Sequence, residues 1–324
     1  MAPCRLSRRA LLAAALLPGR PGLAAPGAAP GAEPWRGAIS LLVGARPGTA
    51  GDQWARGFAP FLERHLMRVS VGVSNLPGEG GLAALRATAS AAPDGHTIGL
   101  IATPVTLASA VERDATALLD AADPIAGVAE ETLVLVVPPN APAELAALRQ
   151  PAEGAVLATP PAGSGGHLAA QSLREALPLS ILAFASAAAA RQAAQAGNVA
   201  AALVPLPDAI AALRDDRLGA AAIATPARSP LLPEVRTFKE QGVRFAFLAQ
   251  RGVVAPPGLP DGMRGTLVAA LQSVVGDPEF AAQADDNGFV PHFMPGAEWR
   301  GSMRQSLEEL RARWRATPWI DRHG

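Results

Sequence analysis

The sequence contains no tyrosine, and its few phenylalanines and tryptophans bring the aromatic content to only 4%. Aromatic platforms on which nucleic-acid bases stack are therefore not expected. Basic and acidic residues are equal in number, at 28 each, so no positive surplus attracts a polyanion to the chain. Together these two scarcities exclude nucleic acid as a partner.

Cysteine is almost absent as well. The single copy, Cys4, lies near the N-terminus, so the rest of the chain can form no disulfide and has no cysteine nucleophile or metal ligand. The five histidines are scattered without an H-x-x-x-H or H-E-x-x-H spacing, at positions 65, 96, 167, 292 and 323. We therefore expect no metal site. No glycine turn has G-x-G-x-x-G spacing or a following Lys-Ser/Thr, so we expect no cofactor either.

The N-terminus has the pattern of an export signal. Arg5, Arg8 and Arg9 precede the apolar run Ala10–Leu17, and small residues and prolines follow. The run is too short to anchor the chain in a bilayer, and no later stretch is long and apolar enough to do so. The segment Ser7–Leu12 resembles a twin-arginine signal. We assign residues 1–32 to this signal and a small-residue linker; a disordered apolar tail is the alternative.

Apolar segments and turns alternate in a way that predicts an α/β fold. Strand patterns at residues 38–44, 69–74 and 97–101 are separated by helix patterns at 53–67 and 82–91, which favours parallel βαβ layers. After a strand at 132–137 the alternation restarts, with strands at 155–159, 181–185, 200–204 and 220–224. Segments 245–250 and 252–255 read as a return crossing, followed by helices at 261–275 and 298–314. Two lobes are predicted, with the last helices returning to the first lobe.

Three glycine-rich turns, at residues 47–51, 77–81 and 163–166, each open a helix. Free N–H groups and the positive end of the helix dipole make such a turn suited to binding an anion, a carboxylate or a phosphate. Ordinary helix capping is the alternative for each turn. Ligands of parallel sheets bind beyond the carboxyl ends of the strands, where these turns are expected to gather.

Ser164 and nearby His167 suggest a nucleophile and its base. The spacing is not G-x-S-x-G, because position 162 is alanine, so a helix cap or a ligand-binding hydroxyl is favoured. Asp52 is predicted either to cap the first helix or to hold the first turn in place. Arg56 is predicted to form an ion pair rather than to bind a ligand.

Several motifs follow one another in a recognisable order. They lie at Arg46–Arg56, Asn75–Gly81, Ala92–Thr97, Gly163–Ala169, Arg228–Thr237 and Ala255–Pro260. They resemble the patterns P-P-G-G-x-x-D-x-x-A-R, N-x-P-G-x-G-G, A-P-D-G-Y-T, a glycine/serine loop before H-L-A, R-S-x-x-L-P-D-V-P-T and A-P-x-G-T-P. These patterns are typical of the periplasmic receptors of tripartite tricarboxylate transporters, the Bug-type solute-binding proteins. The resemblance extends from residue 36 to the C-terminus.

This resemblance implies a two-lobed periplasmic binding protein of type II-like fold with a ligand cleft between the lobes. Residues 33–137 and 251–324 would form lobe 1, and residues 138–250 lobe 2. The protein would be a periplasmic monomer, not an enzyme, that captures a small organic acid and delivers it to a membrane permease. The ligand-binding residues implied are Gly48, Thr49, Ala50 and Thr103 in lobe 1, and Thr159, Ser164, Gly165, Gly166 and Ser186 in lobe 2.

The chain departs from the family at two places in lobe 2. Relatives usually carry V-P-Y-K-G where this chain has Phe184–Ala188, and often an acidic residue and asparagine where it has Val204 and Pro205. The absence of an acid at 204 disfavours an amino-acid ligand and suggests a less polar pocket, or a weakened one. The alternative functions are a secreted α/β hydrolase using Ser164 and an orphan binding protein that serves a sensor.

Overall fold

A computed structural model describes residues 37–150 and 152–319 of the chain. The predicted export signal lies outside these ranges. The first part of the described chain comprises β1 (Gly37–Val43), α1 (Ala50–His65), β2 (Val69–Asn75), a 3-10 turn (Glu79–Gly81), α2 (Leu82–Ala89), β3 (Thr97–Thr103), α3 (Val105–Glu112), α4 (Leu118–Ala121) and β4 (Asp123–Val137).

The middle part comprises α5 (Leu145–Leu148), β5 (Val156–Thr159), α6 (Gly165–Ser172), β6 (Ser180–Ala183), α7 (Ala187–Gln195), β7 (Ala201–Pro205), α8 (Leu206–Arg214), β8 (Gly219–Ile223) and a 3-10 turn (Lys239–Gln241). The last part comprises β9 (Leu248–Ala255), α9 (Asp261–Val275), α10 (Pro278–Asn287), β10 (Val290–Pro295) and α11 (Gly296–Ala316). No helix in the described ranges combines the length and apolar character that crossing a membrane requires.

A ten-stranded mixed sheet connects these elements, in the order β2-β1-β3-β9-β4-β7-β5-β6, with β10 and β8 also pairing with β4. The parallel layers predicted from the sequence are confirmed: β1 pairs parallel with β2 and β3, and β5 pairs parallel with β6 and β7. We call the part built on β1, β2, β3, β9 and β10 the first lobe and the part built on β5 to β8 the second lobe.

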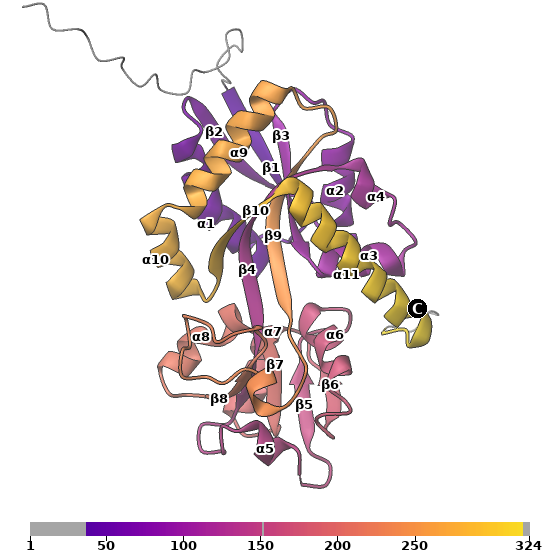
Figure 1. The fold of residues 1–324 in the computed structure, drawn as a ribbon, viewed down its shortest axis with the longest axis vertical. Helices are drawn as coiled ribbons and strands as arrows, with labels where there is room; N and C mark the ends of the chain where they lie inside the picture. The colour runs from indigo at the N-terminus through magenta and orange to yellow at the C-terminus, as the bar shows by residue number, and fades with distance from the viewer. Residues whose placement is uncertain (1–36, 151, 320–324) are drawn as a thin grey trace, which may run out of the picture. The chain divides into compact units, whose positions relative to one another are not determined.

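The strand β4 runs through both lobes (Figure 1). Its first part pairs with β9 and β10, and its last part pairs with β7 and β8. The sequence predicted a strand only at 132–137, whereas β4 begins at Asp123, because Pro124 and Gly127, which are unfavourable in strands, interrupt the apolar run of its first part. The predicted lobe boundary at 250/251 falls inside β9, and the limits of the lobes stay a prediction.

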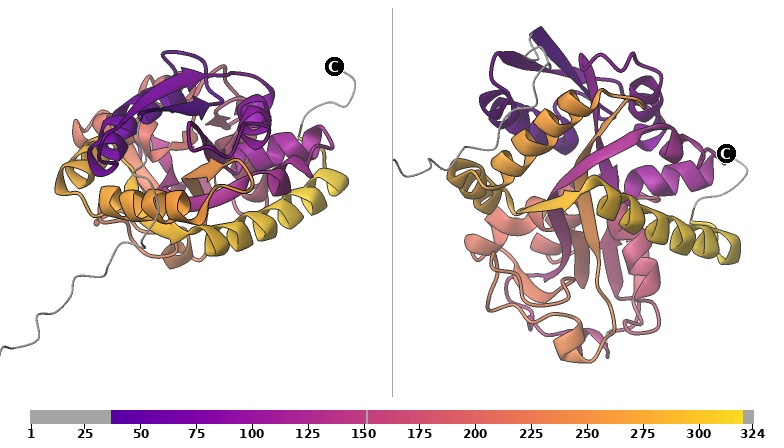
Figure 2. Two further views of the ribbon diagram at one scale, coloured as in Figure 1. Left: turned by 90° about the horizontal axis from the view of Figure 1, so that it is seen from above. Right: turned by 45° about the horizontal axis from the view of Figure 1, so that its top comes forward.

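Helices cover both faces of the first-lobe strands. Apolar side chains of α1, α9 and α10 pack on one face, in a cluster that includes Phe58 and Phe280. Those of α2, α3 and α11 pack on the other face, around the fully buried Trp299. Figure 2 (right) shows β10 and α11 passing across the β4–β9 pair. Helices from both ends of the described chain therefore complete the same lobe.

Trp299 of α11 packs directly on the two crossing strands. A side chain at Gly252 of β9 would overlap its ring, and one at Gly127 of β4 would lie 3.6 Å from its Cγ. The missing side chains at these two glycines make room for the indole. Trp299 therefore holds α11 against the pair of strands that joins the lobes.

The turn at 77–81 is used for packing rather than for an open anion site. Gly80 has φ +64°, and a side chain there would overlap Ser109 Oγ of α3. Gly81 approaches Thr106 of the same helix, with an added Cβ at 3.2 Å from its Oγ1. The start of α2 is thus covered by α3, so this turn packs two helices together, a role that differs from both the anion site and the helix cap considered from the sequence.

Replacing Trp299 by alanine should lower the free energy of unfolding by about 3–5 kcal/mol, because the substitution leaves a large cavity under α11. Urea unfolding followed by circular dichroism measures this difference. Met67→Ala is the matched control, since the Met67 side chain is 81% exposed and its loss should cost almost nothing. Equal unfolding midpoints for Trp299→Ala and wild type would contradict the role given to Trp299.

Candidate functional site

The carboxyl ends of the strands in the two lobes face each other across β4. Thr103, at the end of β3, pairs with Gln250 of β9, which pairs with Glu130 of β4. Pro205, at the end of β7, pairs with Leu133 of β4. Because β3 runs in the same direction as β4 and β7 runs in the opposite direction, only two residues of β4 separate the two ends. Ligands of parallel sheets bind at such edges, so the site is expected here.

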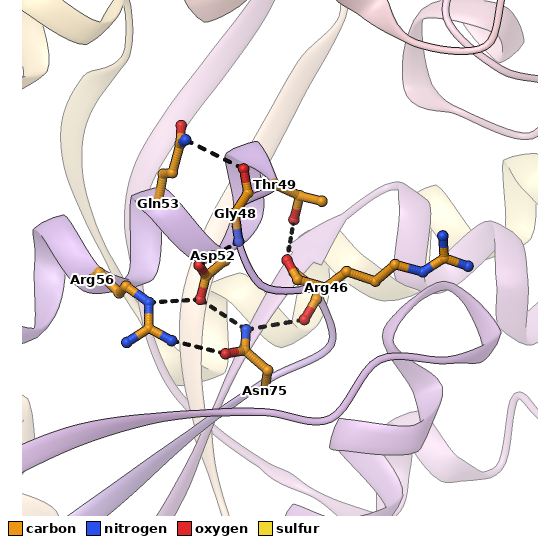
Figure 3. Close-up of polar contacts among 8 residues, drawn as sticks. Arg46, Gly48, Thr49, Asp52, Gln53, Arg56 and Asn75 are labelled. Atoms are coloured by element: carbon orange, nitrogen blue, oxygen red, sulfur yellow. Dashed lines mark hydrogen bonds and ion pairs between the residues drawn. The ribbon is translucent and has the colours of Figure 1, made fainter.

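The first turn is held in shape by the carboxylate of Asp52 (Figure 3). Its Oδ2 accepts a hydrogen bond from the N–H of Gly48 at 2.8 Å, and its Oδ1 accepts from Arg56 Nε at 2.9 Å and Asn75 Nδ2 at 2.8 Å. Asn75 also donates to the Ala45 carbonyl, and its Oδ1 accepts from Arg56 Nη2. Of the two roles predicted for Asp52, the structure shows the anchoring of the turn. Arg56 forms the predicted ion pair.

These hydrogen bonds keep Asp52 ionised. The bond from Arg56, followed by those from Gly48 and Asn75, lowers the pKa of Asp52 to about 2, against a smaller opposing effect of burial. The carboxylate therefore stays charged throughout the neutral range. Through Asn75, the segment that begins the 75–81 motif is tied to the turn at 46–52.

The predicted ligand-binding residues of this turn, Gly48, Thr49 and Ala50, are exposed at the start of α1. Thr49 occupies the N-cap position, but its hydroxyl donates to the Arg46 carbonyl at 2.7 Å instead of capping the helix. The first hydrogen bond within α1 runs from Gln53 N to Thr49 O. The N–H groups of Ala50 and Gly51 come before it in the chain and therefore have no partner within the helix. They are available to an acceptor from outside the helix.

The second predicted turn starts α6. Ser164 is the N-cap, and its Oγ accepts a hydrogen bond from the His167 N–H at 3.3 Å. The ring of His167 is engaged elsewhere, with Nδ1 bonded to Thr159 Oγ1 and Nε2 to Gln171 Nε2, both at 3.1 Å. Burial, with a smaller contribution from Arg174, lowers the pKa of His167. Ser164 is therefore a helix cap, and His167 is not placed to activate it as a nucleophile.

The remaining predicted residues differ in exposure. Thr159 is fully buried behind the turn, and Gly166 is buried against Pro160. Thr103 is buried at the end of β3, where its hydroxyl accepts from Gln250 N at 3.3 Å. Ser186 is exposed and caps α7 by accepting from the Ala189 N–H at 3.0 Å.

The predicted residues thus form separate groups. Thr159 and Ser164 are brought together through His167, while no hydrogen bond among the described residues joins the 48–50 turn to the 164–166 turn. Gly165 lies against the Phe247 ring, since an added Cβ would be 2.8 Å from it. The second turn is therefore next to the chain that crosses between the lobes.

Sequence reasoning missed a charged pair between the crossing strands. Arg251 of β9 binds Glu131 of β4 through both carboxylate oxygens, at 2.5 Å and 3.0 Å. The two side chains are only 15% and 10% exposed, and the guanidinium lies 5.2 Å from the ring centroid of Trp54 in α1. The charged doublet Glu130-Glu131 before an apolar strand was the available signal. An acid at such a place must be paired to remain charged.

Two cavities lie near this ion pair: the pair itself lines the first, and Gln250, next to Arg251 in the chain, lines the second. One, of about 410 Å³, is lined by α1, α8, α10 and the two crossing strands, and includes Ala50 and Asp208. The other, of about 490 Å³, is lined by Thr103, α6, α11 and residues 244–250. Within the described ranges, no three histidine, cysteine, aspartate or glutamate side chains gather into a group that could hold a metal ion.

The anchoring role of Asp52 predicts a pH-dependent stability. Since its folded pKa of about 2 lies below the ordinary 3.8, its contribution is complete above about pH 4 and is lost as the pH falls towards 2. Asp52→Asn should therefore melt at a lower temperature than wild type at pH 7, and the difference should shrink below pH 4. Asp261→Asn, at an exposed position, is the control. A difference that stays constant down to pH 2.5 would argue against the charge as the anchor.

Solved structures of other proteins share this fold. The periplasmic binding protein BugD superposes with a TM-score of 0.71 at 21% identity, covering 87% of this chain and 98% of that protein. MatC from Rhodopseudomonas palustris, solved with bound malate, superposes with a TM-score of 0.67 at 24% identity, covering 86% and 98%. The predicted α/β fold of a two-lobed periplasmic binding protein is confirmed.

The sequence comparisons identify the family. A UPF0065 protein of Bordetella pertussis is 28% identical over 262 residues, which are 78% of this chain and 81% of that protein. Residues 55–314 match the family described as tripartite tricarboxylate transporter family receptor. This match spans most of the chain and contains both the 163–166 turn and the crossing strands. The protein is therefore a solute-binding receptor rather than an enzyme, and it belongs to the receptor family of the tripartite tricarboxylate transporters.

Proposed function

We propose that this receptor captures a small organic carboxylate between its lobes in the periplasm and delivers it to a membrane permease. The observation that carries the proposal is the placement of helix starts at the facing carboxyl ends of parallel strands: α1 follows β1, α6 follows β5 and α7 follows β6. Free N–H groups at these starts favour an anion. Two further facts support a carboxylate: the family serves tricarboxylate transporters, and the similar MatC structure holds malate.

In the first lobe, the ligand carboxylate would bind at the turn of Gly48, Thr49 and Ala50 and accept hydrogen bonds from the free N–H groups of Ala50 and Gly51. The carboxylate of Asp52 already fixes the Gly48 N–H, which leaves the N–H groups at the start of α1 to the ligand. Holding these donors in place before binding reduces the ordering cost of binding. This pre-formed turn is the anchor that we assign to the first lobe, and Thr103 at the end of β3 is the other contact proposed there.

In the second lobe, the hydroxyl-bearing caps, half-buried Ser164 and exposed Ser186, are the proposed contacts. Ser164 and Gly165 start α6, and Ser186 starts α7. The buried Thr159 and Gly166 would act behind them: Thr159 orients His167, and Gly166 allows the turn to approach Pro160 closely. A ligand that binds both lobes stabilises the closed arrangement over open ones, so closure is a population shift.

Delivery and compartment are the finer parts of the proposal. The family name connects its receptors with tripartite transporters, so we expect the permease of such a transporter to be the partner. The export signal predicted for residues 1–32 would bring the chain to the periplasm. We expect the receptor to act as a monomer.

A panel of carboxylates tests the proposal by thermal melting. Protein freed of carried-over ligand by unfolding and refolding is melted with malate, succinate, glutarate, citrate and benzoate. An acid present at 100 times its dissociation constant should stabilise the fold by about 2.7 kcal/mol. Succinamide, which has the shape of succinate without its charge, is the control and should leave the melting temperature unchanged. A broad panel without any shift would overturn the proposal.

Ser164→Ala tests the second-lobe anchor. Loss of the cap should cost about 0.5–2 kcal/mol of stability, and the dissociation constant of an acid found in the panel should rise. Ser273→Ala removes a hydroxyl that bonds only the Ala269 carbonyl on α9 and should leave binding unchanged. Calorimetric titration of both variants measures the effect. An unaltered affinity in Ser164→Ala would remove Ser164 from the proposed site.

A further inference from the structure

The cavity of about 410 Å³ beside the first turn is the feature that the proposed function leaves unused. Its lining includes Ala50 and Gln53 at the start of α1 and Asp208 in the first turn of α8. The cavity therefore begins at the turn to which we assign the ligand carboxylate and ends in the second lobe. A ligand held at residues 48–50 would have its other end facing this space.

Arg251 is the one cation that the described residues place in the lining of the cavity, and it is already paired. Arg251 uses two of its nitrogens on Glu131, and its guanidinium lies over the ring of Trp54. A second carboxylate on the ligand would find no unpaired positive group in the lining. It would instead meet the negative charge of Asp208, since the charge of Glu131 is balanced by Arg251. The lining therefore disfavours an anionic group at the far end of the ligand.

Asp208 is the unpaired acid of the cavity. Its carboxylate accepts no hydrogen bond from any described residue, although the other acid of the lining, Glu131, has its full pairing with Arg251. Burial, and then the negative charge of Glu131, raise the pKa of Asp208 to about 6, against the smaller effects of Arg191 and Arg251. Asp208 is nevertheless mostly ionised at neutral pH. A positive group beside it would relieve the cost of this buried charge.

Position 204 is a valine in this chain, where relatives often carry an acidic residue, but Val204 does not line the cavity and so does not determine its polarity. Val204 is fully buried in the core of the second lobe, packed with residues of α7 and α8. Asp208 lies on the next turn of chain, at the start of α8, and lines the cavity. The structure thus supplies an acid close to the place where the sequence alone suggested that none was present.

We propose that this cavity binds a cationic nitrogen, so that the preferred ligands are carboxylates with an ammonium group at the opposite end. The carboxylate would bind at the 48–50 turn, and the ammonium would lie beside Asp208, between α1 and α8. This inference rests on the proposed function for the carboxylate end only. Since the ligand then contacts the starts of α1 and α8, which belong to different lobes, the ammonium also favours closure.

Three five-carbon acids test the inference by calorimetric titration at pH 8. They are 5-aminopentanoate, pentanoate and glutarate, which carry an ammonium, a methyl group and a second carboxylate at the far end. We expect 5-aminopentanoate to bind at least tenfold more tightly than pentanoate, and glutarate to bind more weakly than 5-aminopentanoate. Asp208→Asn should abolish the preference, whereas Asp261→Asn, at an exposed helix start, should keep it.

The same preference should depend on pH. Asp208 is ionised at pH 8 and mostly neutral at pH 5. The affinity for 5-aminopentanoate relative to that for pentanoate should therefore decrease from pH 8 to pH 5 in wild type, and it should not change with pH in Asp208→Asn. The other charged groups around Asp208 are Glu131, Arg191 and Arg251. The flat profile of the variant would assign the pH dependence to Asp208 itself.

A probe without a carboxylate separates this inference from the proposed function. Millimolar n-butylammonium should raise the melting temperature of wild type and not that of Asp208→Asn. If the acids fail to bind while n-butylammonium acts through Asp208, the carboxylate function is wrong and the cation site stands. If the acids bind but 5-aminopentanoate has no advantage, or n-butylammonium acts equally on both proteins, the inference is overturned and the carboxylate function stands.

Discussion

The antiparallel pairing of β4 with β9 is the constraint on which the rest of the molecule depends. The first-lobe strand β3 pairs with β9, and the second-lobe strands β7 and β8 pair with the last part of β4. The ion pair between Glu131 and Arg251 spans these two strands where the lobes meet. Removing one partner would leave a buried charge uncompensated, at a cost far above that of a surface pair. The pair therefore favours a single register of β9 on β4, and with it the facing of the strand ends.

The elements that the sequence predicted well are those whose signals are local. The helix predicted at 261–275 coincides with α9, because Pro260 and Gly276 mark its two ends. The strands β1, β2 and β3 were found from apolar segments bounded by turns. The strand β10 was missed because its sequence contains two prolines and it pairs only with β4, a contact distant in the chain. The first part of β4 was missed because Pro124, Gly127 and the acidic pair Glu130-Glu131 interrupt the apolar run that marks a buried strand.

The candidate site shows the same division. The glycine turns and the cap Ser164 carry local signals and were predicted, and Asp52 was assigned a role near the first turn. The cavity residues Asp208, Glu131 and Arg251 come from three distant segments, and only the strand register places them together. No local pattern states that an acid in the first turn of α8 will lack a partner. Such residues become visible only when the tertiary contacts are known.

The first lobe has a consequence for the order in which the protein can fold. Its sheet takes β1 to β3 from the start of the described chain and β9 and β10 from near its end, while Trp299 of α11 closes the core over Gly127 and Gly252. During synthesis, the ribosome must therefore reach α11 before this core can form, whereas β5 to β8 follow one another without interruption. Until these later helices are made, α1 lacks its neighbour α9, and α3 lacks its neighbour α11. A newly made chain thus keeps apolar surface of its first lobe uncovered until α11 has emerged.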